Sequence, residues 1–503
     1  MERKLKPLRE LAELLRRDAR GDRRVVHCHG VFDLLHPGHI RHFLAAKREG
    51  DILVVTITPD RFVNKGPGRP AFPEYLRAES IAALGMVDYV AINEWPTAVE
   101  TIALLQPDVY TKGKEYTDAS ADLTGFRDEE VAVREAGGRM HFTDDITFSS
   151  SKLLNEHFGV LPVAARAYLT DFRTRFAATD IVDLLRALRG MRVLVIGDAI
   201  IDEYHSCRPI GLASKSATLS AQFLGAEQQA GGALAIANHV GSFCDKVDVI
   251  TCLGATDSRE DFIRSNLKPS VTPHVFLRPD GPTTVKRRYV DFRLQKLFEI
   301  TFLQDRPLPQ DIAAGIDGLL RETRDVYDAV LVADFGYGMF TSGTKEMLED
   351  VKGYRALNVH TNSANMGFNA VTAFRSADYV CINELELRIA SHDRFGPVDA
   401  LGDPLRERLH AALLTATLGR EGSATWDGRS VLHTPAFCSE VIDTIGAGDA
   451  FFSIAALCAA ARMPTELVAF LGNAAGALAS RVVGNRESVE FPALAKYVTT
   501  LLK

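Results

Sequence analysis

The sequence predicts an α/β protein made of two domains, each with a largely parallel sheet. Two observations support this prediction. The chain has 503 residues, which is too long for one ordinary hydrophobic core. In both halves, short apolar stretches of strand length alternate with stretches of helical periodicity, and such alternation is typical of parallel sheets built from crossover units.

In the N-terminal half, strands are expected at Arg24–Gly30, Leu53–Thr58 and Tyr89–Ile92. Helical patterns at Ile40–Glu49 and Glu74–Leu84 separate them. The first strand runs directly into a glycine turn. We therefore expect one α/β domain over residues 1–160.

The pattern changes near residue 160. Two helices are expected at Tyr168–Phe176 and Ile181–Leu188, the second capped by Thr179 or Asp180, and we interpret residues 161–190 as a helical linker. Strand and helix then alternate again over residues 191–503. The strands expected there include Arg192–Asp198, Val330–Asp334 and Tyr379–Asn383.

Composition narrows the function classes. Hydrophobic residues make up 46% and charged residues 24%, as in soluble globular proteins, and a net charge of −7 predicts no nucleic-acid or acidic-membrane partner. The longest apolar run, Ala450–Ala461, is too short to span a bilayer, and the charged N-terminus lacks the apolar core of a secretory signal. Seven scattered cysteines without a Cys-x-x-Cys pair favour reduced thiols in the cytoplasm over disulfides or a zinc site.

The first candidate site lies in the string Gly30-Val-Phe-Asp-Leu-Leu-His-Pro-Gly-His39. Pro37 suits the first turn of a helix, so His36 and His39 are expected at the positive end of a helix dipole. There they could stabilise charge that builds up on a polyphosphate. The alternatives are two histidines that only cap a helix, or a metal pair.

This string resembles the motif of the cytidylyltransferase-like nucleotidyltransferases, which have a Rossmann-like fold. The resemblance implies direct attack of a phosphorylated metabolite on a nucleoside triphosphate, with release of pyrophosphate. It implies catalytic roles for His36, His39 and Lys47. It also implies nucleotide or phosphate contacts by a larger set: Gly30, Phe32, Asp33, Lys65, Arg77, Lys112, Gly113, Ser149, Ser150 and Ser151. The arrangement is most similar to the adenylyltransferase half of ADP-heptose synthases, but His29 stands where those enzymes have asparagine, so ATP and CTP both stay open.

The second candidate site is Gly446-Ala447-Gly448-Asp449, followed by an apolar run of helical length. A tight glycine loop that leads into a helix N-terminus gathers N–H groups around an anion. An aspartate at that position could take the proton from an alcohol that attacks a phosphate. Taken alone, the motif fits a glycine turn with an acidic cap equally well.

With Asp443-Thr444 before it, the stretch resembles the signature of ribokinase-like (PfkB-type) sugar kinases, over roughly residues 190–500. The resemblance implies that Asp449 is the base and that Ile445 to Gly448 form the anion hole. It implies Mg²⁺ placement by Asn383 and Glu386 and sugar contacts by Asp198 and Asp202. Further expected nucleotide contacts are Thr444, Gly446, Ala447, Gly448, Asn383, Gly419 and Gly422, and further expected sugar contacts are Gly231, Gly232, Lys286 and Arg288.

Three stretches depart from the kinase pattern. Ala235 takes the place of an asparagine, Tyr337 takes the place of a lysine, and Asn358-Val359-His360 replaces Asp-Pro-Lys. These changes leave the sugar and the activity of the kinase half open.

Together the halves resemble a bifunctional heptose-phosphate kinase and adenylyltransferase in reversed order, with a small β lid on the kinase domain. The expected reactions are phosphorylation of a sugar phosphate by ATP with Mg²⁺, and then transfer of a nucleotidyl group to the sugar 1-phosphate. The resemblance also implies a homodimer through the lid, within Ser206–Gly225 and Thr283–Glu299. The alternative is a cytidylyltransferase for an alditol or amino-alcohol phosphate, fused to a kinase-like binding or dimerisation module.

Overall fold

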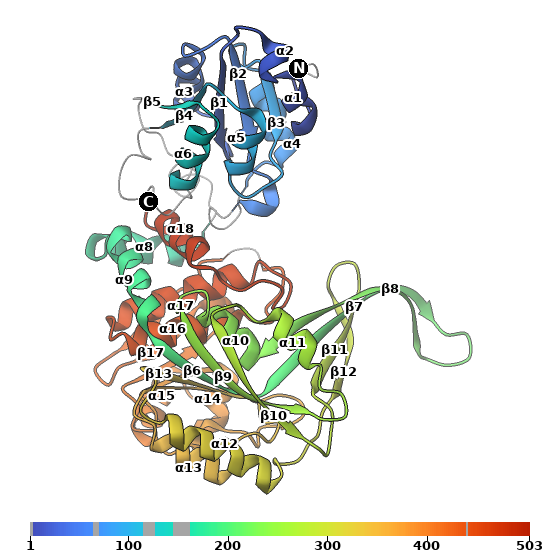
Figure 1. Ribbon diagram of the computed structural model, residues 1–503. Coiled ribbons are helices and arrows are strands. Elements are labelled where there is room, and N and C mark those ends of the chain that lie inside the picture. Colours follow the sequence, from blue (N-terminus) through green and yellow to red (C-terminus); the bar gives the residue numbers. More distant parts are fainter. Residues whose placement is uncertain (1–3, 64–69, 114–125, 144–160, 439–440) are drawn as a thin grey trace. The chain divides into compact units, whose positions relative to one another are not determined.

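The computed structural model describes residues 4–63, 70–113, 126–143, 161–438 and 441–503 (Figure 1). The chain divides into two compact units, residues 1–163 with 495–503, and residues 164–494. Both are α/β, as the sequence predicts. Among the described residues, no helix is both long and apolar enough to cross a membrane.

The first unit is built on a five-stranded parallel sheet with the order β3-β2-β1-β4-β5. Its strands are β1 (Val25–Gly30), β2 (Ile52–Ile57), β3 (Tyr89–Ile92), β4 (Val109–Gly113) and β5 (Arg139–Thr143). Its helices are α1 (Leu8–Leu14), α2 (Arg17–Arg20), α3 (Pro37–Lys47), α4 (Glu74–Ala82), α5 (Val99–Leu105) and α6 (Phe126–Glu135). β2 is buried along its whole length, because its two faces lie against separate apolar clusters.

The second unit is built on a nine-stranded sheet with the order β10-β9-β6-β13-β14-β15-β16-β17-β18. β17 pairs antiparallel with both β16 and β18, and the other neighbouring strands pair in parallel. Its strands are β6 (Arg192–Gly197), β9 (Lys246–Gly254), β10 (Val271–Arg278), β13 (Ala329–Asp334), β14 (Tyr354–Val359), β15 (Tyr379–Asn383), β16 (Leu413–Thr417), β17 (Ser423–Trp426) and β18 (Val431–Thr434).

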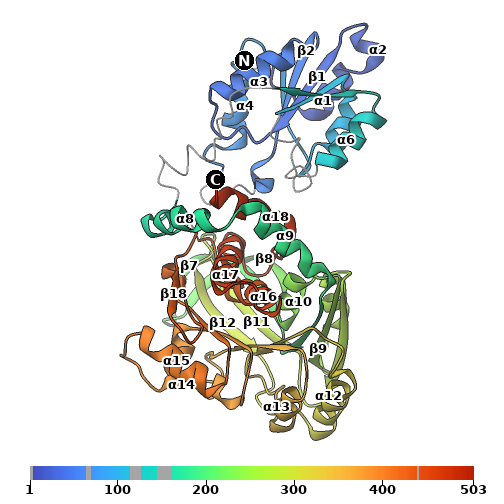
Figure 2. The same cartoon turned by 90° about the vertical axis from the view of Figure 1, so that its left-hand side faces the viewer.

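Helices cover both faces of this sheet (Figure 2). The helices of the second unit are α8 (Val163–Arg175), α9 (Ala178–Ala187), α10 (Ala233–Val240), α11 (Glu260–Asn266), α12 (Gln310–Thr323), α13 (Ser342–Glu349), α14 (Glu384–Ser391), α15 (Asp399–Arg408), α16 (Ala447–Ala460) and α17 (Thr465–Ala479). The last helix, α18 (Phe491–Leu501), begins in the second unit and ends in the first. α16 is apolar on all sides because it lies between the sheet and α17. The predicted cap of α9 is wrong: Ala177 is the N-cap, and Thr179 and Asp180 lie inside the first turn.

A four-stranded sheet forms the lid, with the order β12-β11-β7-β8. It consists of β7 (Ala199–Leu212), β8 (Leu219–Gly232), β11 (Thr284–Val290) and β12 (Lys296–Phe302). β7 begins two residues after β6 ends, and β8 leads directly into α10. Residues of the lid are therefore tied to the carboxyl edge of the nine-stranded sheet.

Candidate active sites

In the first unit, the strand order reverses between β1 and β4. Ligands of open α/β sheets bind at such a switch point, beyond the carboxyl ends of the strands. β1 ends at Gly30 and β4 ends with Lys112 and Gly113, and the two strands pair in parallel. The sheet thus brings these three predicted residues to one edge.

The histidine pair lies at the same edge. His36 is the N-cap of α3, and its Nδ1 accepts a hydrogen bond from the Gly38 N–H at 3.2 Å. The His36 and His39 rings stack with centroids 3.9 Å apart, and the Phe32 ring meets His39 edge-on at 5.3 Å. Two imidazoles therefore lie together at the positive end of a helix dipole, as the sequence predicts.

Asp33 and Arg77 hold the loops around this edge. Asp33 Oδ1 accepts the Ala71 N–H at 2.6 Å. The buried Arg77 guanidinium donates to the carbonyl oxygens of Val31 and Thr58 and forms an ion pair with Asp60. These contacts make Arg77 a bridge between loops, since its donors already have protein partners.

Two sets of buried polar contacts lie beside the site, and the sequence analysis did not predict their partners. His29 joins Thr56 Oγ1 at 2.8 Å and Thr58 Oγ1 at 3.2 Å. Lys112 Nζ lies 2.9 Å from a Glu129 carboxylate oxygen. Burial, together with the charge of Lys112, holds the pKa of His29 well below its usual value. His29 is therefore a neutral hydrogen-bonding group. Its contacts depend on the pairing of β1 with β2 and β4, which the sequence alone does not give.

Lys47 lies at the other end of α3 from the histidines. Its ammonium group forms hydrogen bonds with Asp88 Oδ2 and the Asp51 carbonyl, both at 2.5 Å. Asp51 and Asp88 immediately precede β2 and β3, so this contact marks the amino edge of the sheet. The structure thus separates Lys47 from His36 and His39, and a phosphate role does not fit this position. Lys65 and Ser149 to Ser151 lie outside the described residues.

In the second unit, Asp449 lies in the first turn of α16. Its side chain is buried. Burial raises the pKa of Asp449 to about 6; His360 and Lys286 oppose this shift, whereas Asp202 and Glu386 add to it. A carboxylate with a pKa near 6 suits a general base at neutral pH.

The loop before Asp449 has the conformation that an anion hole needs. Gly446 has φ +80° and is the N-cap of α16, and a Cβ added at Gly448 would meet no atom within 4 Å. The Ile445 N–H donates to Asp443 Oδ1 at 3.1 Å, so this group is already used. In the anion hole expected over Ile445 to Gly448, the N–H groups toward Gly448 would therefore contact the anion, and the Ile445 N–H would not.

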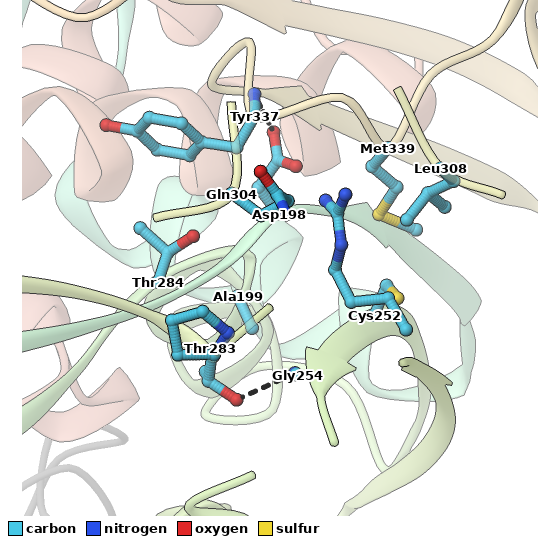
Figure 3. Close-up of a pocket in the computed structure, with 12 residues that line it drawn as sticks. Asp198, Ala199, Cys252, Gly254, Thr283, Thr284, Gln304, Leu308, Tyr337 and Met339 are labelled. Carbon is cyan, nitrogen blue, oxygen red and sulfur yellow. Dashed lines mark hydrogen bonds between the residues drawn. The ribbon is translucent and has the colours of Figure 1, made fainter. Parts of the chain in front are cut away.

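The strand order of the second sheet reverses between β6 and β13, and two carboxylates lie at that point. Asp198 Oδ2 accepts the Phe335 N–H at 2.9 Å, and Asp334 Oδ1 accepts the Gly336 N–H at 2.9 Å. Burial and the charge of Asp334 raise the pKa of Asp198 to about 7. A cavity of about 20 Å³ lies beside Asp198, and Thr283, Gln304 and Tyr337 are among its lining residues (Figure 3). It has room for a water-sized molecule but not for a sugar.

Asp202 and Arg288 form a buried ion pair on neighbouring lid strands β7 and β11. A Cβ added at Gly231 would lie 2.2 Å from Asp202 Oδ2, so this carboxylate needs glycine there. Lys286 Nζ lies 5.5 Å from the Tyr337 ring centroid, and burial lowers the pKa of Lys286. Gly232 is the N-cap of α10. The predicted sugar residues thus gather where the lid meets the sheet.

Asn383 and Glu386 form a capping box at the start of α14. Glu386 Oε2 accepts the Asn383 N–H at 2.8 Å, and Glu386 Oε1 accepts the Thr361 N–H at 3.0 Å. Each carboxylate oxygen thus has a protein donor. Because Mg²⁺ usually keeps several of its waters, these residues fit a hydrated ion held through water.

His360 lies among the predicted kinase-site residues, although the sequence analysis named it only as a departure from the family pattern. Its Nδ1 lies 3.3 Å from Glu386 Oε1, and its Nε2 lies 3.8 Å from Asp449 Oδ1. The ring stacks on Phe335 with centroids 4.4 Å apart. Burial opposes the charged form, but the two carboxylates outweigh it and raise the pKa of His360. The sequence did mark this position, because Asn358-Val359-His360 replaces the Asp-Pro-Lys of the kinase pattern.

The remaining predicted nucleotide residues lie on two turns, one between β16 and β17 and one just before α16. Gly419 (φ +59°) and Gly422 (φ +98°) flank a short turn between β16 and β17. A Cβ at Gly422 would lie 2.0 Å from the Thr434 carbonyl oxygen, whereas one at Gly419 would meet nothing. Thr444 is exposed, and its carbonyl accepts the Ala447 N–H at 3.3 Å.

Comparison with known proteins finds a different family in each half of the chain. Residues 27–156 match the family described as cytidylyltransferase-like, and residues 363–492 match the pfkB family of carbohydrate kinases. The chain is similar to the bifunctional protein HldE of Gluconobacter oxydans, with 43% identity over 155 residues, which is 30% of each chain. It is also similar to HldE of Campylobacter jejuni, with 40% identity over 119 residues, or 23% of this chain and 25% of that protein. The matches thus span about a quarter to a third of these relatives.

Among solved structures, phosphofructokinase-2 from Escherichia coli aligns with a TM-score of 0.51 and 15% identity, over 62% of this chain and all of that one. This likeness shows the fold. The chain therefore combines a cytidylyltransferase-like nucleotidyltransferase domain with a carbohydrate kinase domain of the pfkB family.

Proposed function

We propose that the protein is a bifunctional enzyme that makes a nucleotide-activated sugar. The kinase domain phosphorylates a sugar phosphate, such as a heptose 7-phosphate, at its anomeric hydroxyl. The nucleotidyltransferase domain then joins the sugar 1-phosphate to a nucleotide. The observation that carries this proposal is the buried Asp449 carboxylate at the start of α16, near Lys286 of the lid.

In the kinase step, Asp449 accepts the proton of the acceptor hydroxyl as its oxygen bonds to the γ-phosphorus of ATP. The bond from that phosphorus to the bridging oxygen breaks, and ADP leaves. The N–H groups at the glycine loop hold the transferring group. Lys286 and Arg288 supply positive charge for a phosphate already on the acceptor, and Asp198 and Asp202 accept hydrogen bonds from its hydroxyls. Asn383 and Glu386 would hold a hydrated Mg²⁺ ion, which would neutralise charge on the phosphates.

In the transferase step, an oxygen of the sugar 1-phosphate attacks the α-phosphorus of a nucleoside triphosphate, and pyrophosphate leaves. His36 and His39 stabilise the charge that develops there, together with the N-terminus of α3. Five further residues complete this site at the carboxyl edge of the sheet: Gly30, Phe32, Asp33, Lys112 and Gly113.

The lid is the proposed contact with a second copy of the chain. Large apolar side chains lie exposed along it: Ile210 is 70% exposed, Leu212 71% and Phe223 58%. Exposed apolar patches mark interaction surfaces. Light scattering should give twice the mass of the chain, and Leu212→Asp should give a monomer. A monomeric wild type would contradict the dimer.

We further propose that the domains span residues 1–160 and 191–503, with a helical linker between them. The cytoplasm is the proposed compartment, because both reactions use nucleoside triphosphates.

The test of the kinase assignment is to incubate the protein with ATP, Mg²⁺ and D-glycero-D-manno-heptose 7-phosphate. Mass spectrometry should find a sugar 1,7-bisphosphate; if none forms, the assignment as stated fails. Pyrophosphate release with ATP, compared with CTP, then identifies the second nucleotide. Strict use of CTP would contradict the ADP-heptose reading.

A further inference from the structure

The segment Gly484–Arg486, which follows α17, connects the lid to the glycine loop. The Gly484 N–H donates to Asp443 Oδ2 at 3.1 Å, and the Asn485 N–H donates to Gln229 Oε1 on β8 at 2.7 Å. Asp443 also accepts the Tyr204 hydroxyl of β7 at 2.8 Å. Backbone N–H groups thus anchor this segment to both the loop and the lid.

The side chain of Asn485 lies between two parts of the kinase site. Its Nδ2 donates to Asp202 Oδ2 at 3.2 Å. Its Oδ1 approaches Gly446 so closely that a Cβ there would lie 2.2 Å from it. One amide therefore contacts both the sugar-binding carboxylate and the N-cap of α16.

We propose that Asn485 is a positioning residue of the kinase site, which sets the Asp202 carboxylate relative to the glycine loop. The inference rests on the proposed kinase function. Arg288 holds Asp202 Oδ1 and Asn485 holds Oδ2, so the plane of the carboxylate is fixed from both sides. Since Asp202 is expected to bind acceptor hydroxyls, losing one of these donors lets it turn away from the acceptor.

The test uses two variants of Asn485, assayed for the Michaelis constants of acceptor and ATP. Asn485→Asp keeps the shape of the side chain but replaces the N–H donor that faces Asp202 with an acceptor oxygen. Asn485→Ala removes both the donor and the side-chain volume. A donor role predicts that the acceptor KM rises about tenfold or more in both variants, since a hydrogen bond to a charged group is worth about that factor, and that Asp is at least as harmful as Ala. The ATP KM should change by less than about threefold.

Arg486→Ala is the matched control, because Arg486 lies in the same segment and pairs with Glu227 at the surface. It should leave both constants within about twofold of wild type. If Asn485→Asp behaves like wild type, or if only Asn485→Ala is impaired, the amide merely fills space and the inference is wrong. A wild type that phosphorylates no sugar phosphate would instead overturn the proposed function.

Discussion

His360 Nε2 lies 3.8 Å from Asp449 Oδ1, while the other ring nitrogen faces Glu386 Oε1 at 3.3 Å. The Asn358 side chain fixes the ring, because its Nδ2 donates to the Cys381 carbonyl and its Oδ1 lies 2.6 Å from His360 Nε2. An imidazole thus stands between the proposed base and the proposed metal-placing carboxylate. The two carboxylates raise the pKa of this imidazole, which stands where the sequence departs from Asp-Pro-Lys.

The kinase rate should depend on the protonation of Asp449. Its pKa is raised to about 6, and only the deprotonated carboxylate can accept a proton. Below that pH the rate should therefore fall about tenfold per pH unit, and it should level off above pH 7. The measurement is kcat/KM for the acceptor between pH 5 and 8, at saturating ATP and Mg²⁺. A flat profile across pH 6 would contradict the role of Asp449 as base.

Replacing His360 with alanine should move this profile. His360 lowers the pKa of Asp449, so the loss of its ring should raise that pKa and shift the midpoint to higher pH. We expect kcat at pH 7 to fall by about tenfold or more. His274→Ala is the control, because His274 pairs with Asp248 at the far edge of the sheet. An unshifted midpoint in His360→Ala would show that the ring does not act on the base.

Gly231→Ala should weaken acceptor binding without unfolding the domain. The new Cβ would lie 2.2 Å from Asp202 Oδ2, the end of a side chain that can move only by leaving Arg288 or Asn485. The acceptor KM should rise about tenfold, with little change in the ATP KM. Gly225→Ala, on the same strand, is the control, since its Cβ would meet no atom within 4 Å. Equal effects of the two substitutions would argue against the placement of Asp202 in the acceptor site.

Lys47→Ala should have little effect on nucleotidyl transfer. Its partner Asp88 lies at the amino edge of the sheet, and a half-exposed ion pair contributes about 1 kcal/mol or less to stability. We expect transferase kcat/KM within about threefold of wild type and a slightly lower melting temperature. A loss of a hundredfold would place Lys47 in the site after all.

The sequence was sufficient for the α/β architecture and for the places of the two glycine motifs in it. The two glycine motifs and the strand–helix alternation follow from local chain chemistry, so the β1 turn and the α16 loop lie where they were expected. The predicted Asn383 and Glu386 also begin a helix, because their spacing makes a capping box.

What the sequence could not predict depends on long-range packing. Lys47 has the residue type of a phosphate ligand, but the length of α3 carries it to the opposite edge of the sheet. Asn485 reaches Asp202 across more than 280 positions of the chain. The pKa of His360 is raised by two carboxylates on other elements. Such relationships arise from the fold and leave no pattern in the local sequence.

The central claim, two separate active sites in one chain, is tested most directly with Asp449→Asn and His39→Ala, each assayed for both reactions. Asp449→Asn should abolish sugar phosphorylation and leave pyrophosphate release from a supplied sugar 1-phosphate intact. His39→Ala should lower pyrophosphate release by a factor of about 10² to 10³ and leave phosphorylation unchanged. If either substitution silences both reactions in a folded protein, the two-site account is wrong.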